Sequence, residues 1–105
     1  MIMGKDIHIY VEWKDDMFWN RIGVAELGKR SYEAWNKWDN KGIVGTPEDL
    51  SYELKYEIKE NPDLFGWHWL PMEDFYKLKK AEVFLPDIYK KSEWKNMRVI
   101  WSYDW

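Results

Sequence analysis

The chain of 105 residues has no cysteine, and it has only two histidines and four prolines. Without thiols it cannot form a disulfide framework or a thiolate zinc site, and nucleophilic cysteine chemistry is excluded. No stretch approaches the roughly 18 apolar residues that a membrane-spanning helix needs. The N-terminus also lacks the basic and then apolar pattern of a secretory leader. These absences predict a soluble cytoplasmic protein.

Several sequence motifs of catalysis and nucleotide binding are also missing. The chain has neither the glycine-rich loops that bind dinucleotides and phosphates nor a Gly-x-Ser-x-Gly nucleophile elbow. Its formal net charge is −3, which excludes a broad basic face for duplex nucleic acid. Lysines and Arg98 in the last third leave room for a local basic pocket. No motif identifies a reaction, and no cofactor is implied.

Aromatic residues, in contrast, are abundant: nine tryptophans, seven tyrosines and four phenylalanines. The length predicts a single domain over residues 1–105 with one modest core, which needs only a few large rings. Buried indole and phenol groups require hydrogen-bond partners, so surplus tryptophan and tyrosine tend to line surfaces that meet a ligand. This composition favours a binding protein over an enzyme.

Hydrophobic alternation predicts strands at both ends of the chain. Apolar and polar residues alternate over 6–13 and again over 97–105. Lys14-Asp15-Asp16 has the composition of a turn, and 17–24 is a weaker candidate for the returning strand of a hairpin. We expect the two terminal strands to pair in one sheet.

The middle of the chain has helical signals. Thr46-Pro47-Glu48-Asp49 is typical of a helix start, and Asn61-Pro62 is typical of a helix end. We expect helices in four segments: 30–38, 46–60, from 71 to about 80, and a short one after Pro86. Residues 43–45 and 61–70 are expected to be loops. The prediction is an α+β fold, in which a small antiparallel sheet is covered on one face by three or four helices.

If the terminal strands pair, Ile7, Ile9 and Val11 face the core, since a slip by one residue would bury ionisable groups. The opposite face then gathers polar residues, and a loop with two tryptophans is expected to lie over it. The candidate ligand-binding residues are Asp6, His8, Tyr10, Glu12, Trp67, His68, Trp69, Arg98 and Asp104.

Three interpretations of this face compete. The first is a solvated outer face whose charges pair across strands. The second is a pocket in which rings stack on a nucleotide-type ligand while Arg98 and His8 contact its phosphate or ribose. The third is a metal or hydrolytic site built from Asp6, His8, His68 and Asp104. His68 also has a purely structural interpretation, as a packed ring bonded to a backbone carbonyl.

The segment Gly4-Lys5-Asp6-Ile7-His8-Ile9-Tyr10-Val11-Glu12 resembles the opening of a family of small, largely uncharacterised bacteriophage and bacterial proteins, Met-Gly-x-Asp-Ile-His-x-Tyr-Val-Glu. Similar segments follow at Pro47–Ser51, Gly66–Leu70 and Met97–Asp104. Relatives often have His-Ser-His-Ser-Trp in the loop where this chain has one histidine, which disfavours a two-histidine metal site.

The resemblance implies a phage accessory protein in the cytoplasm of an infected host cell. The leading hypothesis is a non-enzymatic protein that binds a small ligand, such as a nucleotide-type host immune signal. The alternatives are a metal-dependent hydrolase and a protein inhibitor of a host defence enzyme, docking through Trp35 and Trp38. A strand edge and surplus rings also favour a homodimer.

Overall fold

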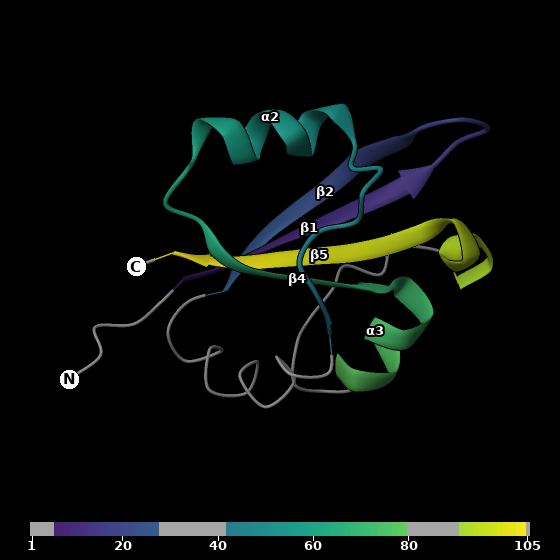
Figure 1. Cartoon of the computed structure of the whole chain (residues 1–105). Coiled ribbons are helices and arrows are strands. Elements are labelled where there is room, and N and C mark those ends of the chain that lie inside the picture. Colours follow the sequence, from purple (N-terminus) through teal and green to yellow (C-terminus); the bar gives the residue numbers. More distant parts are fainter. Residues whose placement is uncertain (1–5, 28–41, 80–90, 105) are drawn as a thin grey trace.

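The computed structural model describes residues 6–27, 42–79 and 91–104. These form an antiparallel five-stranded sheet in the order β2-β1-β5-β4-β3, with two α-helices and a 3-10 helix (Figure 1). The strands are β1 (Asp6–Lys14), β2 (Trp19–Leu27), β3 (Ile43–Val44), β4 (Phe65–Pro71) and β5 (Met97–Asp104). The helices are α2 (Tyr52–Glu60), α3 (Met72–Lys79) and the 3-10 helix η2 (Lys91–Asn96). The predicted α+β class and antiparallel sheet are therefore observed.

The first and last strands, β1 and β5, lie side by side in the middle of the sheet, as predicted. In the β1–β5 pair, Ile7 lies opposite Tyr103 and Ile9 opposite Trp101. All four side chains are buried. The apolar alternation of both segments selects this register, because a shift by one residue would turn each strand over.

The returning strand of the predicted hairpin is also present, as β2. Its pairing with β1 contains an irregularity: Val11 lies opposite Gly23, and Glu12 lies opposite Arg21. Ile22 thus falls between the two pairs as the extra residue of a β-bulge.

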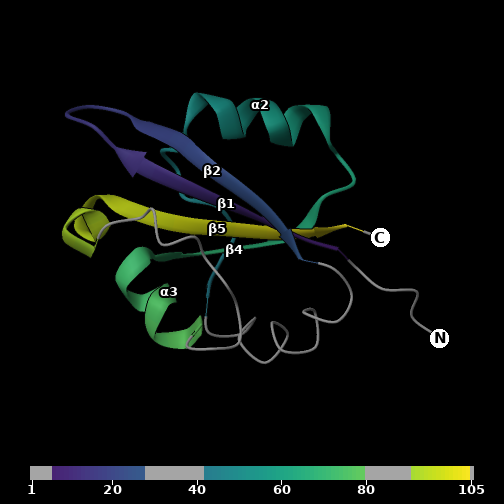
Figure 2. The same ribbon diagram turned by 180° about the vertical axis from the view of Figure 1, so that it is seen from behind.

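Helices cover both faces of the sheet, so the prediction of helices on one face was wrong. Figures 1 and 2 show α2 on one side and α3 on the other. The α3 side holds the larger core, with Trp101 and Phe75 among its buried residues. On the α2 side, Tyr10, Leu54 and Ile100 form a second core. The described residues contain two α-helices, and the helices expected over 30–38 and directly after Pro86 lie outside them.

Residues 61–70 were expected to form a loop, but Phe65–Pro71 is strand β4, next to β5. Large aromatic residues favour strands, and this preference prevails over the nearby Asn61-Pro62 and Pro71. Ile43–Val44, also expected in a loop, forms the short edge strand β3. Gly66 has a φ of 66°, and the β4–β5 register shifts between Phe65 and His68.

Helix α2 begins later than predicted. The Oγ of Ser51 accepts a hydrogen bond from the Leu54 N–H at 3.2 Å, so Ser51 rather than Thr46 is the N-cap. The acidic segment around Asp49 is left in the loop before the helix. The end at Glu60, before Asn61-Pro62, and the start of α3 directly after Pro71 agree with the prediction.

Candidate functional site

The predicted ionisable face is covered by α2 and by the loop that precedes it. Glu12 is 0% exposed and Arg98 is 4% exposed. The Arg98 Nε donates to Glu12 Oε1 at 2.6 Å. For these two residues the interpretation as a solvated face was wrong, and neither is open to a ligand.

Arg98 joins three parts of the chain. Its Nη1 donates to Asp49 Oδ1 at 2.8 Å, and its Nη2 donates to the Asp49 carbonyl at 3.0 Å. The second oxygen of Glu12 accepts from the Ser51 N–H at 2.8 Å. These bonds attach the loop before α2 to the two central strands. Arg98 therefore has a structural role, and its bonds to Glu12 and Asp49 leave it poorly placed to hold a phosphate.

The Trp19 ring packs on this buried charge. The centre of its ring lies 3.8 Å from the Arg98 Cζ, and its Nε1 donates to Asp49 Oδ2 at 2.9 Å. The Arg98 hydrogen bond lowers the pKa of Asp49, with a smaller opposing effect of burial and a further lowering from the Arg98 charge and the Trp19 bond. Asp49 is consequently a carboxylate at neutral pH.

The predicted stacking rings on this face pack against each other. Tyr10, which is buried, stacks on Trp67 with ring centres 5.9 Å apart, and Trp69 packs against the same core. His8 is half-buried in β1. Asp6 and Asp104 are opposite each other at the ends of the two central strands, but their side chains lie outside what the structure describes.

His68 lies on the other face of the sheet. Its neighbours Trp67 and Trp69 point toward α2, so alternation turns His68 toward Trp101, on which its ring stacks at 5.9 Å. The Nδ1–H donates to the Gly66 carbonyl at 2.9 Å, which confirms the structural interpretation of this residue. One metal ion cannot bind both histidines across the sheet. Within the described residues, no three histidine, aspartate or glutamate side chains are grouped as metal ligands.

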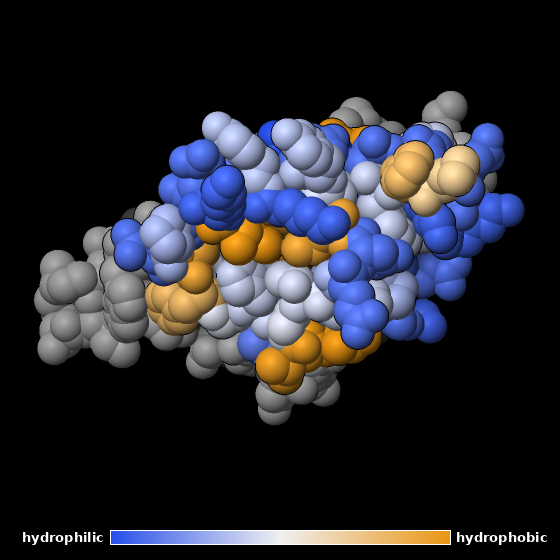
Figure 3. Space-filling model, turned by 45° about the horizontal axis from the view of Figure 1, so that its top comes forward, coloured by the Kyte–Doolittle hydropathy of each residue, from blue (hydrophilic) through white to orange (hydrophobic). Residues whose placement is uncertain are grey.

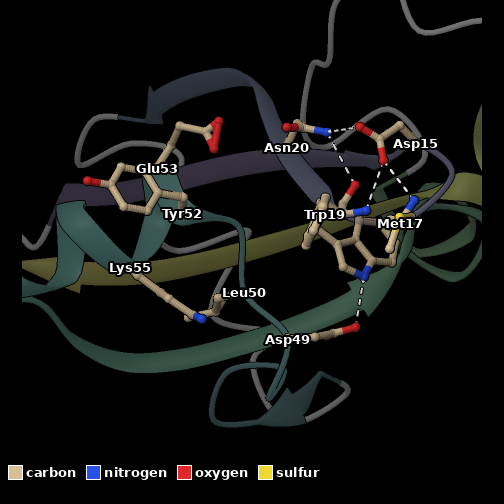
Figure 4. Close-up of a pocket in the computed structure, with 10 residues that line it drawn as sticks. Asp15, Met17, Trp19, Asn20, Asp49, Leu50, Tyr52, Glu53 and Lys55 are labelled. Carbon is tan, nitrogen blue, oxygen red and sulfur yellow. Dashed lines mark hydrogen bonds between the residues drawn. The ribbon is translucent and has the colours of Figure 1, made fainter.

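A hollow of about 410 Å³ lies between the β1–β2 hairpin tip and the start of α2 (Figure 4). Its floor adjoins the Trp19–Asp49 bond. The residues that line it are Asp15, Met17, Phe18, Trp19, Asn20, Asp49, Leu50, Tyr52, Glu53 and Lys55. None of these residues was among the predicted ligand-binding residues.

Three large side chains of this hollow are exposed: Met17 at 74%, Phe18 at 67% and Tyr52 at 81%. Figure 3 shows apolar surface at the end of the molecule where the hairpin turns, bordered by hydrophilic side chains. An apolar patch rimmed by polar groups commonly marks an interaction site.

The hairpin tip is tied down by its own hydrogen bonds. The Asp15 Oδ1 accepts from the backbone N–H groups of Met17 at 2.9 Å and Phe18 at 2.8 Å. The Asp15 N–H donates to the Phe18 carbonyl, and the Asn20 amide donates to Asp15 Oδ2. The Phe18 and Met17 N–H groups, in that order, and then Asn20 lower the pKa of Asp15. These bonds define the backbone conformation of the turn from which the two exposed apolar side chains project.

A sequence signal for this site exists but is weak. Met17-Phe18-Trp19 follows directly on the turn residues Lys14-Asp15-Asp16. Turns favour Gly, Pro, Asn, Asp and Ser, so large apolar residues at a tip are unexpected unless they contact something. The tertiary approach of α2, which creates the hollow, is not readable from this segment.

Searches against protein-family models, curated proteins and solved structures find no match to this chain. No helix within the described ranges is long and apolar enough to cross a membrane.

Proposed function

We propose that the protein is a non-catalytic binding protein whose ligand site is the hollow between the hairpin tip and α2. The observation that carries the proposal is the exposure of Met17 and Phe18, on a hydrogen-bonded turn, beside a hollow that contains carboxylates. Preorganised surfaces lose less conformational entropy on binding, which favours affinity.

The charges of the hollow favour a cationic ligand. Asp15, Asp49, Glu53 and Lys55 line it; because Arg98 already pairs with Asp49, the excess of negative charge over Lys55 comes from Asp15 and Glu53. Since their pKa values are lowered, Asp15 and Asp49 are ionised at neutral pH. An ammonium or guanidinium group is attracted to such a site, whereas the phosphate of a nucleotide faces several like charges. The proposal therefore keeps the binding role expected from the sequence but changes the ligand class.

Benzamidine, a guanidinium-like cation on an aromatic ring, is a suitable probe. We expect it to shift the NMR signal of the Trp19 indole N–H saturably, because this group lies in the hollow. Adenosine triphosphate should cause no such shift. Glu53→Gln should weaken benzamidine binding several-fold, since it removes one carboxylate from the wall.

Glu60→Gln is the matched control, because it changes the net charge equally but lies at the far end of α2. Equal weakening by both substitutions would mean that only net charge matters. A saturable shift with adenosine triphosphate, or no shift with benzamidine, would refute the proposed site.

The resemblance to small phage proteins supplies a proposed setting, an accessory protein acting in an infected host cell. Of the roles considered for such a protein, inhibition of a host protein is favoured by the exposed apolar tip. Binding alone is sufficient for that role.

A further inference from the structure

The shape of the site bears on what kind of molecule carries the cationic group. Met17 and Phe18 line the hollow and are largely exposed to solvent. Tyr52, also exposed, belongs to α2 (Figure 4). Figure 4 shows Tyr52 well apart from Met17. A single small cation in the hollow would leave most of this apolar surface uncovered.

The hydrogen bonds of the tip give the turn that carries Met17 and Phe18 a defined backbone conformation. Asp15 bonds across the turn to the backbone of both residues. Phe and Met are among the residues enriched at protein–protein interfaces relative to the rest of the surface. The tip is therefore suited to a partner with an apolar surface of its own.

Resting on the function proposed above, we infer that the ligand is an extended segment of another protein. A lysine or arginine of that segment enters the hollow, where Asp15 and Glu53 supply the negative charge that Arg98 does not already pair. Apolar residues on either side of this cation cover the tip and Tyr52. The charge complementarity disfavours nucleic acid and anionic lipid, whose phosphates would face the same carboxylates.

Fluorescence polarisation can test the inference with labelled octapeptides in which Arg or Lys alternates with Leu or Phe. Unlabelled N-acetylarginine amide, which has the cation without apolar neighbours, serves as the small competitor. We expect the best peptides to bind at least about tenfold more tightly than this competitor, because they also cover the tip. Peptides with Glu in place of Arg and Lys should not bind.

The double variant Met17→Ser/Phe18→Ser removes the apolar tip and leaves every charge in place. It should weaken the binding of the peptides much more than that of N-acetylarginine amide, so that the advantage of the peptides is lost. Ile43→Ser/Val44→Ser is the matched control, since these exposed apolar residues lie on β3, at the opposite edge of the sheet from β2. This control should bind peptides like the unmodified protein.

The outcomes separate the inference from the proposed function. If N-acetylarginine amide binds and the peptides bind no more tightly, the inference is overturned and the cationic site stands. If the tip variant keeps the full peptide affinity, the inference is also overturned. If neither ligand binds, both proposals are refuted.

Discussion

Arg98 illustrates how a single buried residue is secured by neighbours that are distant in sequence. Glu12 lies directly opposite it on β1, and Asp49 comes from the loop before α2. The carboxylates of Glu12 and Asp49 neutralise the guanidinium charge. Together with the Asp49 carbonyl, they accept hydrogen bonds from its Nε, Nη1 and Nη2. Loss of one partner from such a group is costly, because the other partner stays buried as an unpaired charge.

The substitution Arg98→Met should therefore lower the free energy of unfolding by about 3–5 kcal/mol, because it leaves Glu12 buried without a cation. Urea denaturation followed by tryptophan fluorescence measures this loss. Arg21→Met is the matched control: Arg21 and Glu57 are 3.8 Å apart and about one-third exposed, so we expect a loss below about 1 kcal/mol. Similar losses for both variants would contradict a structural role for Arg98.

The lowered pKa of Asp49 predicts a dependence of stability on pH. A carboxyl group with a folded pKa below its unfolded value stabilises the fold above the unfolded pKa, and this contribution is lost as pH falls through the folded pKa. Stability should thus decline below the ordinary aspartate value of 3.8. Urea midpoints measured from about pH 6 down to about pH 2.5 test this. The decline should be smaller in Asp49→Asn, and an equal decline would exclude Asp49 as a contributor.

At the level of elements, the terminal strands and their pairing are predictable because an alternation such as Ile7-His8-Ile9 has a period of two, and only one register buries its apolar face. The opposition of Glu12 and Arg98 follows from the same register. Their burial does not follow, because it depends on α2 and its preceding loop, whose position is set by tertiary contacts.

Strand β4 was missed for a different reason. A short run rich in rings is compatible with a strand, a buried helix or a loop, and periodicity alone does not separate them. The error also misplaced His68, since a residue on a loop can point toward His8, whereas a residue of β4 between Trp67 and Trp69 cannot. The hollow at the hairpin was missed because it forms between segments some thirty residues apart, as the Trp19–Asp49 bond illustrates.

The close approach of β4 to β5 predicts that Gly66 resists substitution. A Cβ on Gly66 would lie 2.7 Å from the Tyr103 ring, and the φ of 66° is unfavourable for other residues. We expect Gly66→Ala to lower the free energy of unfolding by about 2–4 kcal/mol. Gly45→Ala is the control, because its φ of 94° carries conformational strain but no atom lies within 4 Å of the added Cβ. Thermal or urea denaturation should show the smaller loss for Gly45→Ala, and equal losses would indicate that the contact with Tyr103 relaxes without cost.

At the level of the whole molecule, a sheet covered on both faces allows the hollow to be built from two layers. The hairpin tip belongs to the sheet, whereas Leu50, Tyr52 and Glu53 belong to α2 and its preceding loop. Leu54, which is fully buried, anchors the helix, and Leu50 and Ile58 pack beside it. The position of the helix, and with it the width of the hollow, depends on this contact.

The substitution Leu54→Ala should lower the free energy of unfolding by about 2–5 kcal/mol through the cavity that it leaves. It should also weaken benzamidine binding, because a loosened α2 no longer holds Glu53 in place. Denaturation and the Trp19 indole signal report the two effects separately. Tyr56→Ala, on the exposed side of the same helix, should change stability by less than about 0.5 kcal/mol and leave binding intact. Loss of stability without any loss of binding would show that the hollow does not depend on the packing of Leu54 that positions α2.

The bulge at Ile22 has a consequence for how copies of the chain meet. β2 stands at one end of the strand order, and the extra residue interrupts the regular spacing of its pairing with β1. A strand kinked in this way is a poor template for another strand, which limits growth of the sheet from molecule to molecule. The same hairpin can therefore expose apolar side chains at its turn, while the bulge in its edge strand β2 disfavours the strand addition that leads to fibrils.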